Sequence, residues 1–140
     1  MNNYEIELEK NKKRNEKFID EFAEWLRGKN LKPKTINRHL TNIEVYLNLY
    51  LNNYEFKKME EGVFEVYSFL SDWFIRKCMW SSSSSIKGTA ASIKKFYQCM
   101  SEKGYVKVED YKSLCEEIKD NMDVFLDSLY EYDNFGVGYF

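Results

Sequence analysis

The chain has 140 residues, which suits a single domain of ordinary size. Apolar residues make up 44% of it and aromatic residues 17%, so a hydrophobic core can form and intrinsic disorder is disfavoured. One proline and six glycines disfavour a loop-rich all-β fold, because such folds need frequent turn residues. The 21 basic and 23 acidic residues give a net charge of −2, which neither indicates nor excludes a nucleic-acid partner.

The charge is unevenly distributed along the chain. Residues 25–53 hold five basic residues against one acidic residue (+4), and residues 76–107 hold seven against one (+6). From residue 108 onward two lysines stand against nine carboxylates (−7). The nearly neutral total therefore hides two basic segments, and the sequence predicts a local basic surface.

The cysteines and the single histidine do not form a metal-binding pattern. Cys78, Cys99 and Cys115 are 21 and 16 residues apart without a CxxC pair, and only His39 could assist them. We therefore expect no metal and no cofactor. The odd cysteine count, the lack of a signal segment and the lack of a long apolar run predict a cytoplasmic protein without a membrane span. The lysine-rich composition suits an AT-rich genome, such as that of a bacterium or its phage.

Two helical patterns occupy the first part of the chain. Residues 1–13 are polar and mixed in charge, and we expect a frayed lead-in there. From residue 14 to 27 apolar residues recur at helical spacing, and Gly28 is expected to end this helix in the left-handed conformation. A second helix is predicted from a Thr35 cap onward, with an apolar stripe of Ile36, Leu40, Ile43, Leu47 and Tyr50.

Three further helical patterns follow. A strongly hydrophobic helix is predicted over 66–77, and the last serines of the run 81–85 are expected to cap a fourth helix that ends at Gly104. On this fourth helix one face is predicted to be buried and another cationic. Its buried stripe is Ile86, Ala90, Ile93, Tyr97 and Met100, and its cationic face is Lys87, Ala91, Lys94 and Gln98. A fifth, acidic helix is expected over 108–133, before a nonhelical aromatic tail over 134–140. The apolar stripe of this fifth helix is Tyr111, Leu114, Ile118, Met122, Phe125 and Leu129.

Catalytic residues at diagnostic spacing are missing from the sequence. His39 lies beside the core position Leu40, so a partly buried, hydrogen-bonded imidazole is favoured over a catalytic one. The carboxylate pairs Glu60–Glu61 and Glu116–Glu117 are adjacent in sequence and diverge on a helix. We therefore expect no enzyme activity and no small-molecule substrate.

Basic residues gather at the starts of the second and fourth helices, where free backbone amides and the helix dipole also favour phosphate. A solvated lysine-rich surface is the alternative interpretation. Short polar side chains at the same places can approach base edges. Few arginines lie near these surfaces, so contacts to the phosphate backbone and DNA shape should dominate binding. The predicted DNA contacts are Lys32, Lys34, Thr35, Asn37, Arg38, Thr41, Arg76, Lys77, Ser85, Lys87, Thr89, Lys94 and Lys95, with Ser92 as a further polar side chain near the bases.

Two segments carry a resemblance to a known family. Residues 31–46 resemble the first signature of the amino-terminal core-binding domain of tyrosine recombinases (phage integrases). That signature reads Thr, an aromatic residue, an aliphatic residue and an aromatic residue. Here the series is Thr35, His39, Ile43 and Tyr46, so a histidine replaces the first aromatic residue. Residues 85–104 are similar to the family's fourth helix and the turn after it.

The resemblance covers about residues 14–107 and implies an all-α, SAM-like orthogonal four-helix bundle, to which this chain adds the acidic helix. In that family the domain forms half of a clamp around duplex DNA. The implied contacts are Lys34, Thr35, Arg38, Lys87 and Lys94. Together with the lead-in and the tail, we expect residues 1–140 to form one helical domain.

Departures from the family are equally informative. Its catalysis needs a His-x-x-Arg pair, whereas His39 is followed by Leu40, Thr41 and Asn42. The usual Asn-Pro after the fourth helix is missing, and no segment of the sequence matches the catalytic domain. We therefore expect a chain that does not cut or rejoin DNA alone.

Two functions of different classes follow from these patterns. The first is a non-catalytic duplex-DNA-binding module of recombinase descent, an accessory factor or competitor in DNA recombination or integration. The alternative is a protein-interaction or oligomerisation module whose acidic helix and aromatic tail bind a recombinase, another partner or a second copy. In a variant of the second function, the acidic helix covers the basic surface of its own domain and inhibits DNA binding.

Overall fold

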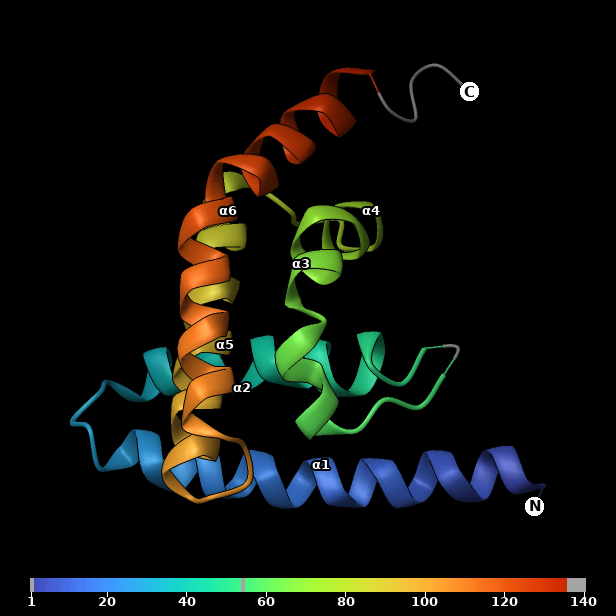
Figure 1. Cartoon of the computed structure of the whole chain (residues 1–140), viewed down its shortest axis with the longest axis vertical. Helices are drawn as coiled ribbons and strands as arrows, with labels where there is room; N and C mark the ends of the chain where they lie inside the picture. Colours follow the sequence, from blue (N-terminus) through green and yellow to red (C-terminus); the bar gives the residue numbers. More distant parts are fainter. Residues whose placement is uncertain (1, 54, 136–140) are drawn as a thin grey trace.

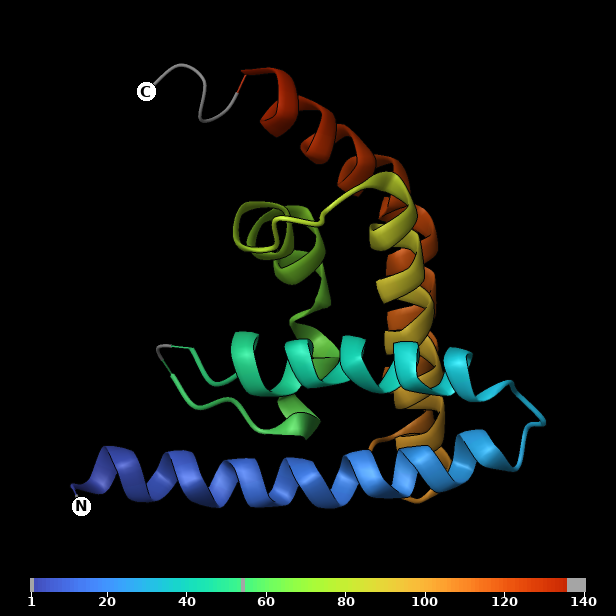
Figure 2. The ribbon, with the colours of Figure 1, turned by 180° about the vertical axis from the view of Figure 1, so that it is seen from behind.

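The computed structural model describes residues 2–53 and 55–135, and this part of the chain is helical without a strand. Two helices lie side by side along one edge of the molecule, and a second pair crosses them steeply (Figure 1). Short helical segments fill the angle between the pairs (Figure 2). The elements are α1 (Asn3–Arg27), α2 (Pro33–Glu44), η1 (Val45–Tyr50), η2 (Met59–Phe64), α3 (Val66–Ser68), η3 (Phe69–Trp73), α4 (Phe74–Lys77), α5 (Ser83–Glu102) and α6 (Val108–Phe135).

Helix α1 is longer at its start than the sequence analysis predicted. Asn2 accepts a hydrogen bond from the Glu5 amide and caps the helix at Asn3. The expected lead-in over 1–13 is therefore helical, and its Asn11 side chain is buried, where it donates to Asn52. These polar contacts hold the first turns of α1 against the end of η1.

The turn after α1 and the start of α2 both differ from expectation. Gly28 has a φ of −69°, and Asn30 is the residue with a positive φ, at 58°. Asparagine tolerates this conformation better than most residues do, so it makes the turn. Helix α2 begins at Pro33, whose fixed φ suits the first helical position, after Lys32 as the N-cap. Thr35 therefore lies inside the first turn and is not the cap.

The second and third predicted helices each contain a π-helical turn. Helix α2 continues into η1, where the Leu51 amide donates to the Tyr46 carbonyl five residues earlier. The predicted helix over 66–77 is the continuous run α3–η3–α4. Aromatic rings of the two π-helical turns pack against each other edge to face, with Tyr46 against Phe69 (centroids 4.8 Å apart) and Tyr50 against Trp73 (5.5 Å).

Helix α5 has the carboxyl end and the faces that its sequence predicts, but it begins earlier than expected, with Ser82 as its N-cap in place of the last serines of the run. Ser82 and Ser85 form a reciprocal capping box at its start. At its end Gly104 has a φ of +83°, and the Tyr105 amide donates to the Met100 carbonyl, which is a Schellman motif. The predicted inner stripe of α5 is buried, whereas Lys87 is exposed.

Helix α6 extends beyond its predicted end and belongs to the main core. It runs antiparallel to α5 and then continues past it (Figure 1). Its stripe buries Leu114, Ile118 and Phe125 in the same hydrophobic cluster as the other helices. Asn134 and Phe135, predicted to be nonhelical, form its last turn, and residues 136–140 of the predicted tail lie outside the described residues.

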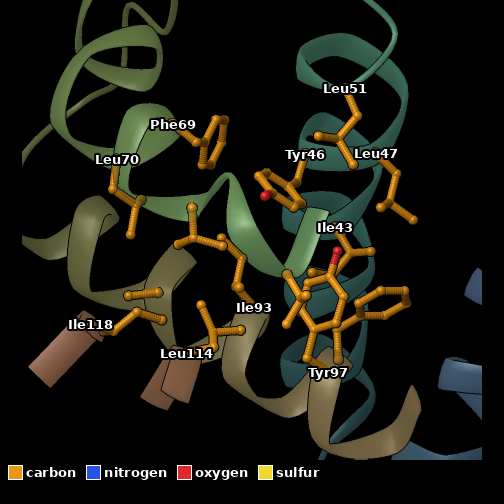
Figure 3. Close-up of a cluster of buried hydrophobic side chains, with 14 of the residues drawn as sticks. Ile43, Tyr46, Leu47, Leu51, Phe69, Leu70, Ile93, Tyr97, Leu114 and Ile118 are labelled. Carbon is orange, nitrogen blue, oxygen red and sulfur yellow. The ribbon is translucent and has the colours of Figure 1, made fainter. Parts of the chain in front are cut away.

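The centre of the core is built around two buried tyrosines and one glycine. Figure 3 shows Tyr46 and Tyr97 among aliphatic side chains of α5, α6 and η3. The Tyr46 hydroxyl donates to the Gly62 carbonyl, and the Tyr97 hydroxyl donates to the Met59 carbonyl at 2.8 Å. Both buried hydroxyls are satisfied, and they fix η2 against η1 and α5.

Over the described ranges, no helix combines the length and apolar character needed to cross a membrane.

Candidate nucleic-acid interface

Helix α2 presents a polar, cationic outer face. Lys34, Asn37, Arg38 and Thr41 are all exposed, at helical spacings that place them on neighbouring turns. Lys32 is exposed at the cap position and makes no side-chain capping bond. Thr35 is half-buried. The exposed amide of Asn37 lies between Lys34 and Arg38 along the helix, and the exposed Thr41 hydroxyl follows Arg38 by about one turn, so α2 offers both phosphate donors and groups able to reach base edges.

Helix α5 presents cations but few polar side chains. Lys87 is exposed, and Lys94 and Lys95 are half-exposed. Thr89 is 2% exposed and Ser92 is fully buried, so the expectation that these two side chains reach DNA bases is wrong. They fall on the side of α5 that packs inside the molecule. Ser85 is engaged in the capping box. Helix α5 can therefore contribute phosphate contacts only.

A hydrogen-bonded crossing joins α2 to α5. The Nδ1 atom of His39 lies 2.7 Å from the Ser92 Oγ atom, and the Asn42 amide donates to the same oxygen at 2.9 Å. Ser92 in turn reaches the Gly88 carbonyl at 3.1 Å. Burial lowers the pKa of His39, and the charges of Arg38 and Lys95 lower it further. One cation of each helix therefore flanks the same imidazole.

The cations of this region share a second property, which is the lack of an acidic partner. We call Lys34, Arg38, Lys87, Lys94 and Lys95 the basic face, and none of them forms an ion pair with a described residue. Ion pairs elsewhere in the described ranges include Arg14–Glu60 (3.1 Å) and Lys57–Glu65 (2.6 Å). The crossing of α2 and α5 thus concentrates uncompensated positive charge.

Two further predicted contacts lie apart from the basic face. Arg76 in α4 forms a two-pronged ion pair with Asp72, which also lowers the pKa of that carboxyl. Lys77 is exposed at the end of α4. Beside them, Met79 is fully exposed and Trp80 is 58% exposed in the turn before α5. The charge of Arg76 is compensated by Asp72, so this pair adds less to a phosphate surface than the basic face does.

The sequence analysis missed a groove next to the basic face. Lys119, Tyr111 and Gln98 line it together with Lys94 and Lys95. Their signal was present, because Tyr111, Cys115 and Lys119 recur every four residues along one helix face. The strong acidic bias of the segment outweighed it.

Of the candidate catalytic groups, His39, Glu60 and Glu61 are engaged in structural contacts, whereas Glu116 is exposed and one carboxyl oxygen of Glu117 is buried without a hydrogen-bond partner in the described part of the chain. His39 is 3% exposed, and its Ser92 neighbour is buried, so a substrate has no access to this pair. Glu60 pairs with Arg14, and Glu61 accepts from the Lys58 amide. Burial raises the pKa of Glu117, which also accepts from the Tyr67 amide. Among the described residues, no three histidine, cysteine or acidic side chains gather as a metal site.

Comparison of the chain with protein-family models, with curated proteins and with solved structures returns no match. The resemblance to the recombinase domain therefore depends on residues 31–46 and 85–104 alone.

Proposed function

We propose that this chain is a non-catalytic module that binds duplex DNA through the basic face. The observation that carries the proposal is the concentration of unpaired cations across the α2–α5 crossing. Unpaired surface cations bind the phosphate backbone by releasing its counterions, without a metal or cofactor. The pair of helices is also the pair that the recombinase resemblance places on DNA.

In this proposal α2 and α5 make different contacts with DNA. Helix α2 lies closer to the bases, because Asn37 and Thr41 are exposed there beside Lys34 and Arg38. Helix α5 holds the backbone through its lysines. With arginine limited to Arg38 on this face, bidentate readout of guanine is limited, and affinity depends mainly on phosphate contacts.

The proposal also covers the arrangement of the helices and the biological role of the chain. The crossing of α1 and α2 by α5 supports a SAM-like bundle, to which α6 is added. An accessory or competitor role in recombination or integration accords with a DNA-binding module that lacks exposed catalytic groups.

Binding to a labelled, mixed-sequence 30-base-pair duplex, followed by fluorescence anisotropy at several salt concentrations, tests the function. We expect the double variant Arg38→Glu/Lys87→Glu to weaken binding at least tenfold and to lower the salt slope by about 1.8, or 0.9 per lost contact. The matched control is Lys12→Glu/Lys13→Glu, with the same charge change on exposed residues of α1. Equal effects of both variants would show that only net charge matters and would overturn the assigned face.

An observation on α6 favours self-association as the second function. Val124 and Tyr130 are exposed apolar side chains in the second half of α6, the helix whose end continues past α5 (Figure 1). Sedimentation of the free chain separates the two functions, since a concentration-dependent dimer without DNA affinity would support the second.

A further inference from the structure

The groove between α5 and α6 has a cationic lining drawn from both helices. Its volume is about 510 Å³, and it is lined by Ala91, Lys94, Lys95, Gln98, Tyr111, Cys115 and Lys119. Three lysines thus surround one groove, and none of them forms an ion pair within the described ranges. Like charges held close together repel one another, so an anion bound among them would be stabilised by all three.

Lys95 connects this groove to the basic face. It lines the groove, and its charge, like that of Arg38, lowers the pKa of the His39 imidazole. Lys95 therefore links the imidazole at the α2–α5 crossing to the groove at α6. A strand whose phosphates contact Arg38 and Lys95 would have Lys94 and Lys119 as the further cations of the groove.

The other groove residues suit an oxyanion. Ala91 has a small side chain, which leaves room between the helices for a ligand. Gln98 offers an amide donor. Burial, and then the neighbouring Cys115 thiol, raise the pKa of Tyr111 to about 12, so its hydroxyl keeps its proton at neutral pH and can donate.

We infer that α6 belongs to the DNA-binding surface, and that Lys119 and Tyr111 complete a groove that takes the phosphodiester backbone. This inference rests on the proposed function and reverses the expectation that the acidic helix shields the basic surface. The carboxylates of α6 border the groove, with Glu116 and Asp120 exposed beside it. They limit how far the nucleic acid extends along α6.

The variant Lys119→Glu tests the inference against Lys12→Glu, which makes the same charge change on an exposed residue of α1. We expect Lys119→Glu to weaken binding to the 30-base-pair duplex roughly three- to tenfold and to lower the salt slope by about 0.9. Lys12→Glu should change neither quantity appreciably. Both variants should keep the helical circular dichroism spectrum of the parent chain, because both side chains are exposed.

Cys115 provides an independent readout inside the groove. It is half-exposed, whereas Cys78 and Cys99 are buried, so iodoacetamide should modify Cys115 first. We expect duplex DNA to slow this alkylation at least fivefold when the groove is occupied, as followed by the mass of the modified peptide.

The outcomes of these experiments distinguish a failure of the groove assignment from a failure of the proposed function. If the duplex binds and Arg38→Glu/Lys87→Glu weakens it, but Lys119→Glu behaves like Lys12→Glu and Cys115 stays reactive, the groove assignment is wrong and the function stands. If the duplex does not bind, the function is wrong, and inorganic polyphosphate then tests the groove. Protection of Cys115 by polyphosphate that is lost in Lys119→Glu would retain an anion site there, and full reactivity would overturn it.

Discussion

The Nδ1 atom of His39 lies 2.7 Å from the Oγ atom of Ser92, which joins α2 to α5 where the basic face is centred. The contact is buried, and Arg38 and Lys95 lie near enough for their charges to act on the imidazole. Protonation of His39 would place a third positive charge beside those of Arg38 and Lys95 at a buried site. The crossing therefore depends on a neutral imidazole.

The first prediction concerns the pH dependence of stability. The folded pKa of His39 is lowered below its usual 6.5, so the unfolded chain binds this proton more readily than the folded chain does. His39 therefore costs stability as the pH falls through about 6.5 and costs nothing well above it. We expect the free energy of unfolding, measured in urea, to fall more between pH 7.5 and pH 5.5 in the parent chain than in His39→Asn.

The comparison with His39→Asn isolates this group from the carboxyls. The raised pKa of Glu117 acts in the opposite direction, because its stabilising protonated form accumulates as the pH falls toward 4.5. The lowered pKa of Asp72 removes stability only near and below pH 3.8. Both contributions are common to the two chains and cancel in the difference. Parallel pH profiles would contradict the assignment to His39.

The second prediction concerns two glycine substitutions that should change the stability of the chain in opposite directions. A Cβ atom at Gly62 would overlap the Tyr97 hydroxyl and lie 2.8 Å from Leu51 Cδ1, in a fully packed part of the core. We expect Gly62→Ala to destabilise the chain by about 1–3 kcal/mol. Gly88→Ala in α5 meets no atom within 4 Å and should stabilise by about 0.5–1 kcal/mol, because alanine loses less backbone entropy in a helix. Thermal denaturation of both variants measures the direction of each stability change. A Gly62→Ala variant as stable as the parent chain would refute the close packing around Gly62.

Periodicity predicted the helices because most of them bury one continuous stripe. The stripes of α5 and α6 were read correctly, since core spacing such as Leu114 to Ile118 leaves little ambiguity. The end of α5 at Gly104 was equally predictable, because its φ of +83° is a conformation that glycine favours. In both cases local chemistry and tertiary packing favour the same structure.

The errors occurred where a distant contact decides the local structure. Residues 3–13 looked like a polar lead-in because nearly all of them are exposed, and the one buried side chain, Asn11, meets Asn52, which is 41 residues away. Thr89 looked like a surface residue because it is polar, although it lies three residues after Ile86 and four before Ile93 on the buried side of α5. The π-helical turns depend on aromatic rings from two segments packing together, as Tyr46 and Phe69 do. The groove at Lys119 needs both α5 and α6 in place.

The third prediction concerns the reactivity of the cysteines. Burial raises the pKa of both the Cys78 and the Cys99 thiol to about 11, so the reactive thiolate is scarce in the folded chain. We expect one fast-reacting thiol with Ellman's reagent at pH 8, which the half-exposed Cys115 provides, and two that react only on unfolding. Cys115→Ser should remove the fast phase. A persistent fast phase in that variant would show that a buried thiol is accessible.

The fourth prediction concerns the acidic residues of α6. Deleting residues 108–140 would remove Leu114, Ile118 and Phe125 from the core, so deletion cannot test whether the acidic charge inhibits DNA binding. Neutralising exposed carboxylates with Asp123→Asn/Asp127→Asn leaves the core intact.

We expect this double variant to raise duplex affinity by less than about threefold at physiological salt. Described carboxylates of α6 form no ion pair with the basic face, so they act only through long-range, screened repulsion. Anisotropy with the 30-base-pair duplex measures the change, and Lys112→Glu serves as a control that adds negative charge to the same helix. An increase above tenfold would instead mean that α6 carboxylates occupy the basic face in solution, and the acidic helix would then be an inhibitor of DNA binding.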